Sequence, residues 1–118
     1  MPREFILVSE RSPDTDDLRA AAGALGHTVT IARAKAGALD LVLDGEGRVL
    51  LSVEYTQRIA VPDEIERLAP AASSLLPGPV FWTECWAPFG ADGEVGERIA
   101  EGVARACGGV CVKEDGGL

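Results

Sequence analysis

Residues 79–112 read PVFWTECWAPFGADGEVGERIAEGVARACGGVCV and contain the densest group of large side chains in the chain. Both tryptophans and two of the three phenylalanines lie here, and outside it the chain has only one phenylalanine and one tyrosine. These four residues fall between Phe81 and Phe89. Because aromatic side chains bury large areas, the sequence predicts that packing concentrates in this segment.

Residues 80–86 have the composition of a β-strand, since they are bulky and aromatic and lie between Pro79 and Pro88. Successive side chains of a strand point to opposite faces. One face then carries Val80, Trp82, Glu84 and Trp86, and the other carries Phe81, Thr83, Cys85 and Ala87. The two faces differ in polarity, so we expect them to meet different surroundings.

An amphipathic helix follows this strand. Its apolar side chains recur at helical spacing, at Val95, Ile99, Val103 and Cys107. Asp92 is the expected N-cap, and the glycines at 108–109 are expected to end the helix. Residues 110–112 then form a last short strand. Strand, helix and strand together predict a βαβ unit, with parallel strands and a right-handed crossover.

The first third of the chain predicts a second strand–helix–strand segment. Residues 5–8 are a continuous apolar run, which is typical of a strand covered on both faces. Ser12 and Pro13 are expected to open a helix that ends at Gly26. Residues 27–32 alternate in polarity and predict a half-exposed strand.

The middle of the chain predicts a hairpin and one further helix. Residues 39–43 and 49–55 alternate in polarity on either side of the turn at 44–47. Residues 62–69 predict a short helix, and residues 70–79 predict a connector.

The predicted elements follow the order β-α-β-β-β-α-β-α-β. This order predicts an α+β fold of two layers, with a single mixed sheet of about six strands and two to three helices packed on it. A ferredoxin-like arrangement with added strands fits the order. The 118 residues are expected to form one domain, with residues 113–118 as a frayed tail.

Composition indicates a soluble protein of a reducing compartment. No apolar run approaches the length of a bilayer span, and the run at 5–8 is too short for a signal peptide. The three cysteines are odd in number and irregularly spaced, which does not suit a disulfide framework. We therefore expect a cytoplasmic protein.

The net charge of −8, from 19 acidic and 11 basic residues, bears on the choice of partner. Binding of nucleic acid or of an anionic membrane depends on a basic patch, so neither is an expected partner. A basic protein would be attracted. Charge of this size also serves solubility, and that simpler account is the stronger one.

Four residue groups are candidate chemical sites, and each has a simpler structural role. Carboxylates at Asp14, Asp16 and Asp17 could hold Mg²⁺, but they also suit the start of a helix. Glycines at Gly90, Gly93 and Gly96 follow a strand without matching a nucleotide-binding spacing. The thiols of Cys85, Cys107 and Cys111 lie on apolar faces, and His27 has no partner nearby in the sequence. We therefore assign no catalytic residue, no cofactor and no metal ligand.

The stripe of Trp82, Glu84 and Trp86 is the best candidate for a binding surface. Two rigid aromatic side chains flank a carboxylate, an arrangement typical of interface hot spots. Glu54 and Tyr55 on the hairpin are expected to extend it. The alternative is that this strand face packs against a second layer, although an unpaired carboxylate in a dry core is unfavourable.

These features predict a non-catalytic, acidic protein-binding module. By analogy, small acidic immunity proteins and antitoxins that inhibit a basic protein share this size and charge. One alternative is a small-molecule sensor or metal-dependent enzyme, with a crevice near Trp82 and Glu84. Another is a homodimer or larger homo-oligomer that uses the tryptophan face as its interface. No catalytic motif is present, so an enzyme is the less favoured class.

Overall fold

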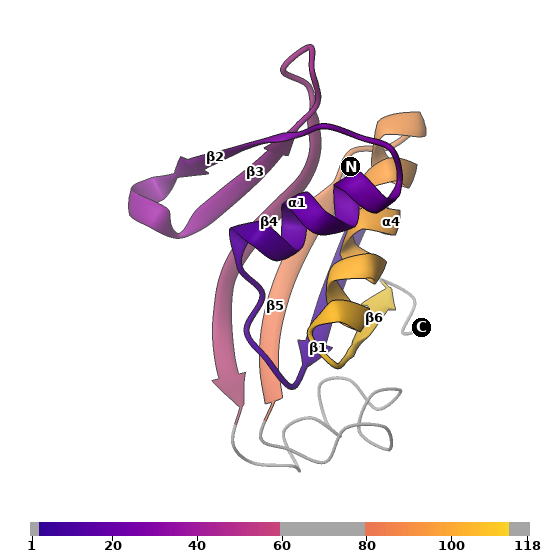
Figure 1. The fold of residues 1–118 in the computed structure, drawn as a ribbon. Coiled ribbons are helices and arrows are strands. Elements are labelled where there is room, and N and C mark those ends of the chain that lie inside the picture. The colour runs from indigo at the N-terminus through magenta and orange to yellow at the C-terminus, as the bar shows by residue number, and fades with distance from the viewer. Residues whose placement is uncertain (1–2, 60–79, 114–118) are drawn as a thin grey trace.

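The computed structural model describes residues 3–59 and 80–113 (Figure 1). In chain order the elements are β1 (Arg3–Ser9), α1 (Thr15–Ala24), β2 (Thr30–Ala34), a 3-10 turn (Lys35–Gly37), β3 (Leu39–Leu43), β4 (Val49–Ile59), β5 (Val80–Ala87), α4 (Ala91–Ala106) and β6 (Val110–Lys113). The helix expected at 62–69, the connector at 70–79 and all but the first residue of the tail at 113–118 lie outside the described residues.

The six described strands form one sheet in the order β2-β3-β4-β5-β1-β6. The α+β class and the single sheet are confirmed. The expected mixture of parallel and antiparallel pairs is not found among the described strands, where every neighbouring pair is antiparallel. β5 and β6 do run parallel to each other, as their βαβ connection requires, but β1 lies between them and pairs with both. The apolar run of β1 is therefore hydrogen-bonded on both sides.

Helices α1 and α4 lie on the same face of the sheet (Figure 1). The main core fills the space between them and the strands. It consists mainly of aliphatic side chains and includes Phe5, Leu7, Leu18, Val42, Leu51, Val53, Ile99 and Val103. Residues 79–112 supply half of this core, as the sequence predicts, but through residues such as Cys85, Ile99 and Val103 and not through their aromatic side chains. Phe89 lies in the turn before α4 and is 61% exposed.

Both helices begin at other residues than the sequence indicated. The N-cap of α1 is Asp14 and not Ser12, because Asp14 and Asp17 form a reciprocal capping box. The N-cap of α4 is Gly90 and not Asp92. Gly90 has a φ of +88°, a conformation that glycine adopts readily. Asp92 instead lies in the first turn, where its charge suits the helix dipole.

Strand β4 departs from the expected strict alternation at two bulges. Between β3 and β4 the register shifts, and both Leu50 and Leu51 enter the core. Between β4 and β5, the residues Glu54 and Tyr55 lie opposite the single residue Glu84. A bulge of this kind bends the strand and increases its twist.

Gly96 allows α4 to approach strand β4 closely, and Gly93 allows its first turn to pack on the preceding turn. A Cβ atom on Gly96 would lie 1.9 Å from the Leu50 carbonyl oxygen, and one on Gly93 would lie 1.6 Å from the Pro88 carbonyl oxygen. Both glycines are buried. The glycine spacing at 90, 93 and 96 therefore serves the packing of this helix on backbone.

We expect Gly96→Ala to lower the free energy of unfolding by about 3 kcal/mol or more, because the methyl group has no room beside a backbone oxygen. Urea denaturation measures the change. The matched control is Gly23→Ala in α1, where a Cβ atom would meet nothing within 4 Å. That substitution should stabilise the protein by about 0.5–1 kcal/mol. Equal effects of the two substitutions would contradict close approach at Gly96.

Candidate functional site

The face of the sheet opposite α1 and α4 is the candidate site, and we call it the outer face. Strand registers and side-chain alternation assign its residues. They include Glu4, Ile6 and Val8 of β1, Leu39 and Leu41 of β3, Ser52, Glu54, Gln57 and Ile59 of β4, Val80, Trp82, Glu84 and Trp86 of β5, and Val110 and Val112 of β6. Neither α1 nor α4 covers this face (Figure 1). The predicted separation of the two faces of residues 80–86 is confirmed, since Cys85 and Ala87 enter the main core.

One half of the outer face is closed. Val8, Val80, Trp82 and Val112 form a second buried cluster there. Trp82 is only 8% exposed, so it offers little contact area to a partner and instead supports the surface around it. Trp86 is half-buried, four positions from the buried Val80–Trp82 end of the strand.

The strands segregate charge between their two faces. The outer face carries three carboxylates, Glu4, Glu54 and Glu84. The basic residues of the described strands are Arg3, Arg33, Arg58 and Lys113, and their registers place all four on the helix side. The outer face of the described strands is therefore acidic and apolar, with no basic side chain.

Three of the four basic side chains on the helix side have carboxylate partners there. Arg3 lies 3.6 Å and Lys113 lies 3.7 Å from Glu97 of α4. The Nε of Arg33 lies 3.3 Å from an Asp40 oxygen, although the geometry is not that of a hydrogen bond. Among the described residues, by contrast, no ion pair engages the three outer-face carboxylates.

Trp86 is the centre of the acidic part of this face. Glu4 of β1 lies directly opposite it on one side, and Ser52 of β4 lies opposite on the other. Glu84 is two residues away on the same strand, and Glu54 is two residues beyond Ser52. Directly opposed side chains have Cβ atoms about 4.5–5.5 Å apart, and diagonal neighbours about 7–8 Å apart. All three carboxylates are thus neighbours of one indole ring.

Of the predicted binding residues, the structure brings Glu54, Glu84 and Trp86 to one region and places Trp82 in the closed half. Tyr55 occupies the bulge beside Glu54, and only its backbone is described. No sequence pattern marks Glu4 as a binding residue. It immediately precedes the apolar run at 5–8, and only the pairing of β1 with β5 places it beside Trp86.

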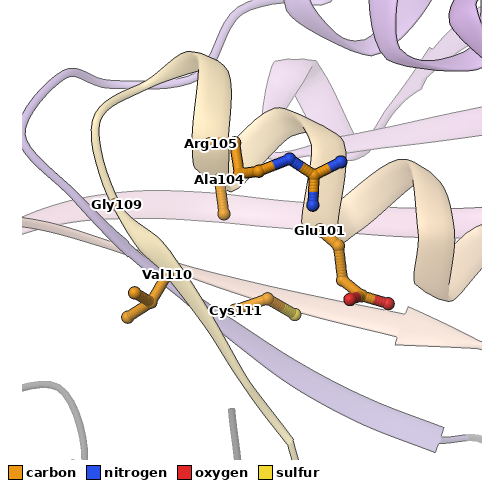
Figure 2. A pocket seen from close by; sticks show the side chains of 6 residues that line it. All are labelled: Glu101, Ala104, Arg105, Gly109, Val110 and Cys111. Atoms are coloured by element: carbon orange, nitrogen blue, oxygen red, sulfur yellow. The ribbon is translucent and has the colours of Figure 1, made fainter.

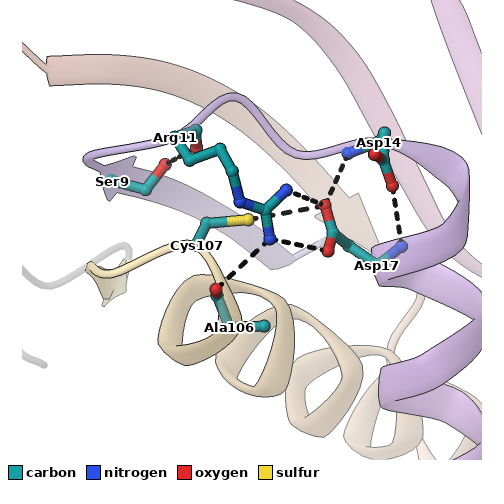
Figure 3. A network of polar contacts seen from close by, with 6 residues as sticks. All are labelled: Ser9, Arg11, Asp14, Asp17, Ala106 and Cys107. Atoms are coloured by element: carbon teal, nitrogen blue, oxygen red, sulfur yellow. Dashed lines mark hydrogen bonds and ion pairs between the residues drawn. The ribbon is translucent and has the colours of Figure 1, made fainter.

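The carboxylates at the start of α1 form a structural network (Figure 3). Arg11 donates two hydrogen bonds to Asp17, at 2.8 and 2.9 Å, and a third to the Ala106 carbonyl at the end of α4. The Asp14 carboxylate caps the helix by accepting from the Asp17 backbone N–H. Asp16 pairs with Arg19 at 3.3 Å. These contacts join the loop after β1 to the far end of α4.

The three thiols are buried and free. Burial is the main cause that raises the pKa of Cys107 to about 11 and that of Cys111 to about 12. The pKa of Cys85 is also raised by burial. Cys111 lines a hollow of about 170 Å³ below Glu101 and Arg105 of α4 (Figure 2). The expected role of the cysteines as small buried hydrophobes is confirmed.

His27 is exposed in the turn after α1, where its backbone N–H donates to the Ala22 carbonyl. Cys85, in contrast, is completely buried in the sheet. The two residues therefore do not form a nucleophile and base pair.

Comparison of the chain with protein-family models, with curated proteins and with solved structures gives no match. Within residues 3–59 and 80–113, no group of three His, Cys, Asp or Glu side chains has the geometry of a metal site. Neither described helix has the length and apolar character needed to cross a bilayer.

Asp17 should make stability depend on pH. The Arg11 hydrogen bonds are the main cause that lowers its pKa from 3.8 to about 2. A lowered native pKa stabilises the fold above pH 3.8, and this stabilisation is lost as pH falls towards 2. Asp17→Asn should therefore lower the free energy of unfolding by about 1 kcal/mol at pH 7. The difference in unfolding free energy between the variant and the wild type should shrink as pH falls from 4 to 2, because the Asp17 carboxylate becomes protonated over this range.

Urea denaturation across this pH range tests the assignment. Asp16→Asn is the control, because the Asp16 side chain is 90% exposed and its ion pair is a surface one. A difference for Asp17→Asn that does not change with pH would contradict the role given to its charge.

The thiols should be unreactive in the native protein. A rise of two pKa units, as for Cys107 from 9.0 to about 11, lowers the thiolate fraction about 100-fold. We expect Ellman's reagent to react at pH 8 at least about 100-fold more slowly than with free cysteine. Three equivalents should react in guanidinium chloride. One fast thiol in the folded protein would show that a cysteine is accessible.

Proposed function

We propose that this chain is a non-catalytic binding module that holds a basic protein on its outer face. The observation that carries the proposal is the segregation of charge. Three carboxylates without ion-pair partners in the described residues share a face that no basic side chain of the strands reaches. A cationic partner would neutralise these carboxylates.

The arrangement of the layers supports this assignment. Without the β2–β3 hairpin, the described elements follow the order β-α-β-β-α-β, and we infer a ferredoxin-like core with two strands added beside β4. In this core both described helices take one face of the sheet. An antiparallel sheet commonly packs one face on the core and presents the other.

The net charge of the chain also favours a basic partner, because it attracts that partner before the two surfaces meet. A charge of −8 attracts a cationic protein and raises its rate of association. Trp86 supplies rigid contact area at the centre of the surface, and Glu84 supplies direction. Inhibition of a basic protein, by analogy with immunity proteins and antitoxins, is one use of such a surface.

A self-associating face is the weaker alternative. In a two-fold dimer through the outer face, the same acidic surface would meet itself. Glu4, Glu54 and Glu84 of two copies would then approach one another without basic side chains from the described strands to neutralise them. Like charges brought together in this way disfavour association.

Two double variants of equal net charge test the proposal. Glu54→Gln with Glu84→Gln removes outer-face charges, and Glu46→Gln with Glu94→Gln removes exposed charges elsewhere. The tagged wild type is used as bait in native-host lysate, and any basic protein retained in stoichiometric amount is purified. We expect the outer-face variant to weaken this complex about 10-fold or more, equivalent to about 1.4 kcal/mol, while the control binds as the wild type does.

The dependence on salt gives a second readout. Affinity should fall as ionic strength rises, because screening weakens attraction between exposed charges. Equal weakening in the two double variants would show attraction to net charge alone. Retention of no basic protein, or of an acidic one, would contradict the proposed partner.

A further inference from the structure

We infer that Trp86, Glu4 and Glu84 form the seat for one arginine side chain of the partner. This inference rests on the proposed function and specifies its chemistry. The three residues come from two paired strands, with Glu4 directly opposite Trp86 and Glu84 opposite Ile6. The two carboxylates therefore lie diagonally across the β1–β5 pair, beside the indole.

The indole ring attracts a cation through the negative potential of its face. A cation within about 6 Å of the ring centroid is attracted to the ring, and the attraction is stronger where water is excluded. Trp86 is half-buried, so part of its surface stays open to a partner. The buried cluster with Val8 and Trp82 lies four positions farther along the same pair of strands. The seat thus combines a partly exposed aromatic ring with carboxylates on the neighbouring positions.

The carboxylates select the planar guanidinium group over the ammonium group. Guanidinium stacks on an aromatic face and presents five N–H donors in its plane. While stacked on Trp86, it can donate sideways to carboxylates at the edge of the ring. An ammonium group is a compact, strongly hydrated charge and cannot stack in this way. Glu4 lies on β1 directly opposite Trp86, and Glu84 lies two residues from Trp86 on β5 itself.

A buried polar atom indicates that tryptophan is not the most stabilising residue at position 86. Its indole Nε1 is buried and has no hydrogen-bond acceptor in the described part of the chain. A buried donor without an acceptor destabilises the fold. Phenylalanine would fill much of the same space without this cost. Local departures from the most stable choice occur at functional sites.

The third carboxylate, Glu54, lies beside a positive charge and is left out of the seat. It lines a hollow of about 200 Å³ together with Lys35, Ala38 and Leu39. Lys35 reduces the attraction of this hollow for a second cation. We therefore place the arginine between β1 and β5, and we assign Glu54 to the general attraction of the partner.

Short peptides test the seat without knowledge of the partner. The probes are acetylated peptide amides of one sequence with a single arginine, and analogues in which lysine or citrulline replaces it. Citrulline keeps the shape but carries no charge. Binding is followed by NMR through the indole N–H signals, and Trp86→Phe assigns the signal of Trp86. This variant should fold, because it removes the unsatisfied Nε1.

We expect the arginine peptide to shift the Trp86 signal and saturate it. The lysine peptide should bind at least about 3-fold more weakly, and the citrulline peptide should cause no shift. Glu4→Gln with Glu84→Gln should weaken the arginine peptide about 10-fold. The double variant Glu46→Gln with Glu94→Gln should leave its binding unchanged.

The outcomes separate this inference from the proposed function. Equal binding of arginine and lysine peptides, or arginine binding unaffected by Glu4→Gln with Glu84→Gln, would overturn the arginine seat while a basic partner stays supported by capture. Shifts confined to Trp82 would also overturn the seat. Equal binding of the citrulline peptide would overturn both, because charge would then play no part at Trp86.

Discussion

The close approach of α4 to the sheet is the constraint on which the rest of the structure depends. Gly93 and Gly96 bring the helix against the backbone at Pro88 and Leu50, where a single added methyl group would overlap a carbonyl oxygen. The same helix contacts α1. Arg11, in the loop before α1, donates hydrogen bonds both to Asp17 of α1 and to the Ala106 carbonyl at the end of α4. Both described helices are thereby held on one face. The opposite face of the sheet is covered by neither of them (Figure 1).

The distribution of charge follows from this division. On the helix side, Arg3 and Lys113 lie near Glu97 of α4, so the basic side chains of the edge of the sheet have partners in the helix layer. The outer face has carboxylates and no such basic side chains on its strands. A net charge of −8 is therefore not spread evenly, and the proposed partner surface lies where the described residues leave the charge uncompensated.

Part of the candidate site could be predicted from the sequence because alternation along one strand is a local property. The shared face of Trp82, Glu84 and Trp86 depends only on the period of a strand. The contrast between a buried Trp82 and a half-buried Trp86 is different, since it depends on Val8 and Val112 from other strands. Glu4 could not be predicted at all, because 82 positions separate it from Trp86 and only their register brings them together. The bulge at Glu54 is likewise a product of pairing.

The sequence by itself determined the elements and their apolar faces: the α+β class, the amphipathic helix at 91–106, the hairpin and the burial of the cysteines. Local propensity and the spacing of apolar residues suffice for these, because each involves near neighbours in the chain. Tertiary structure alone decided the strand order, with β1 inserted between β5 and β6, and so the antiparallel sheet. It also decided that the basic side chains of the strands turn towards the helix layer. These features depend on contacts between residues far apart in the sequence, for which no local pattern exists.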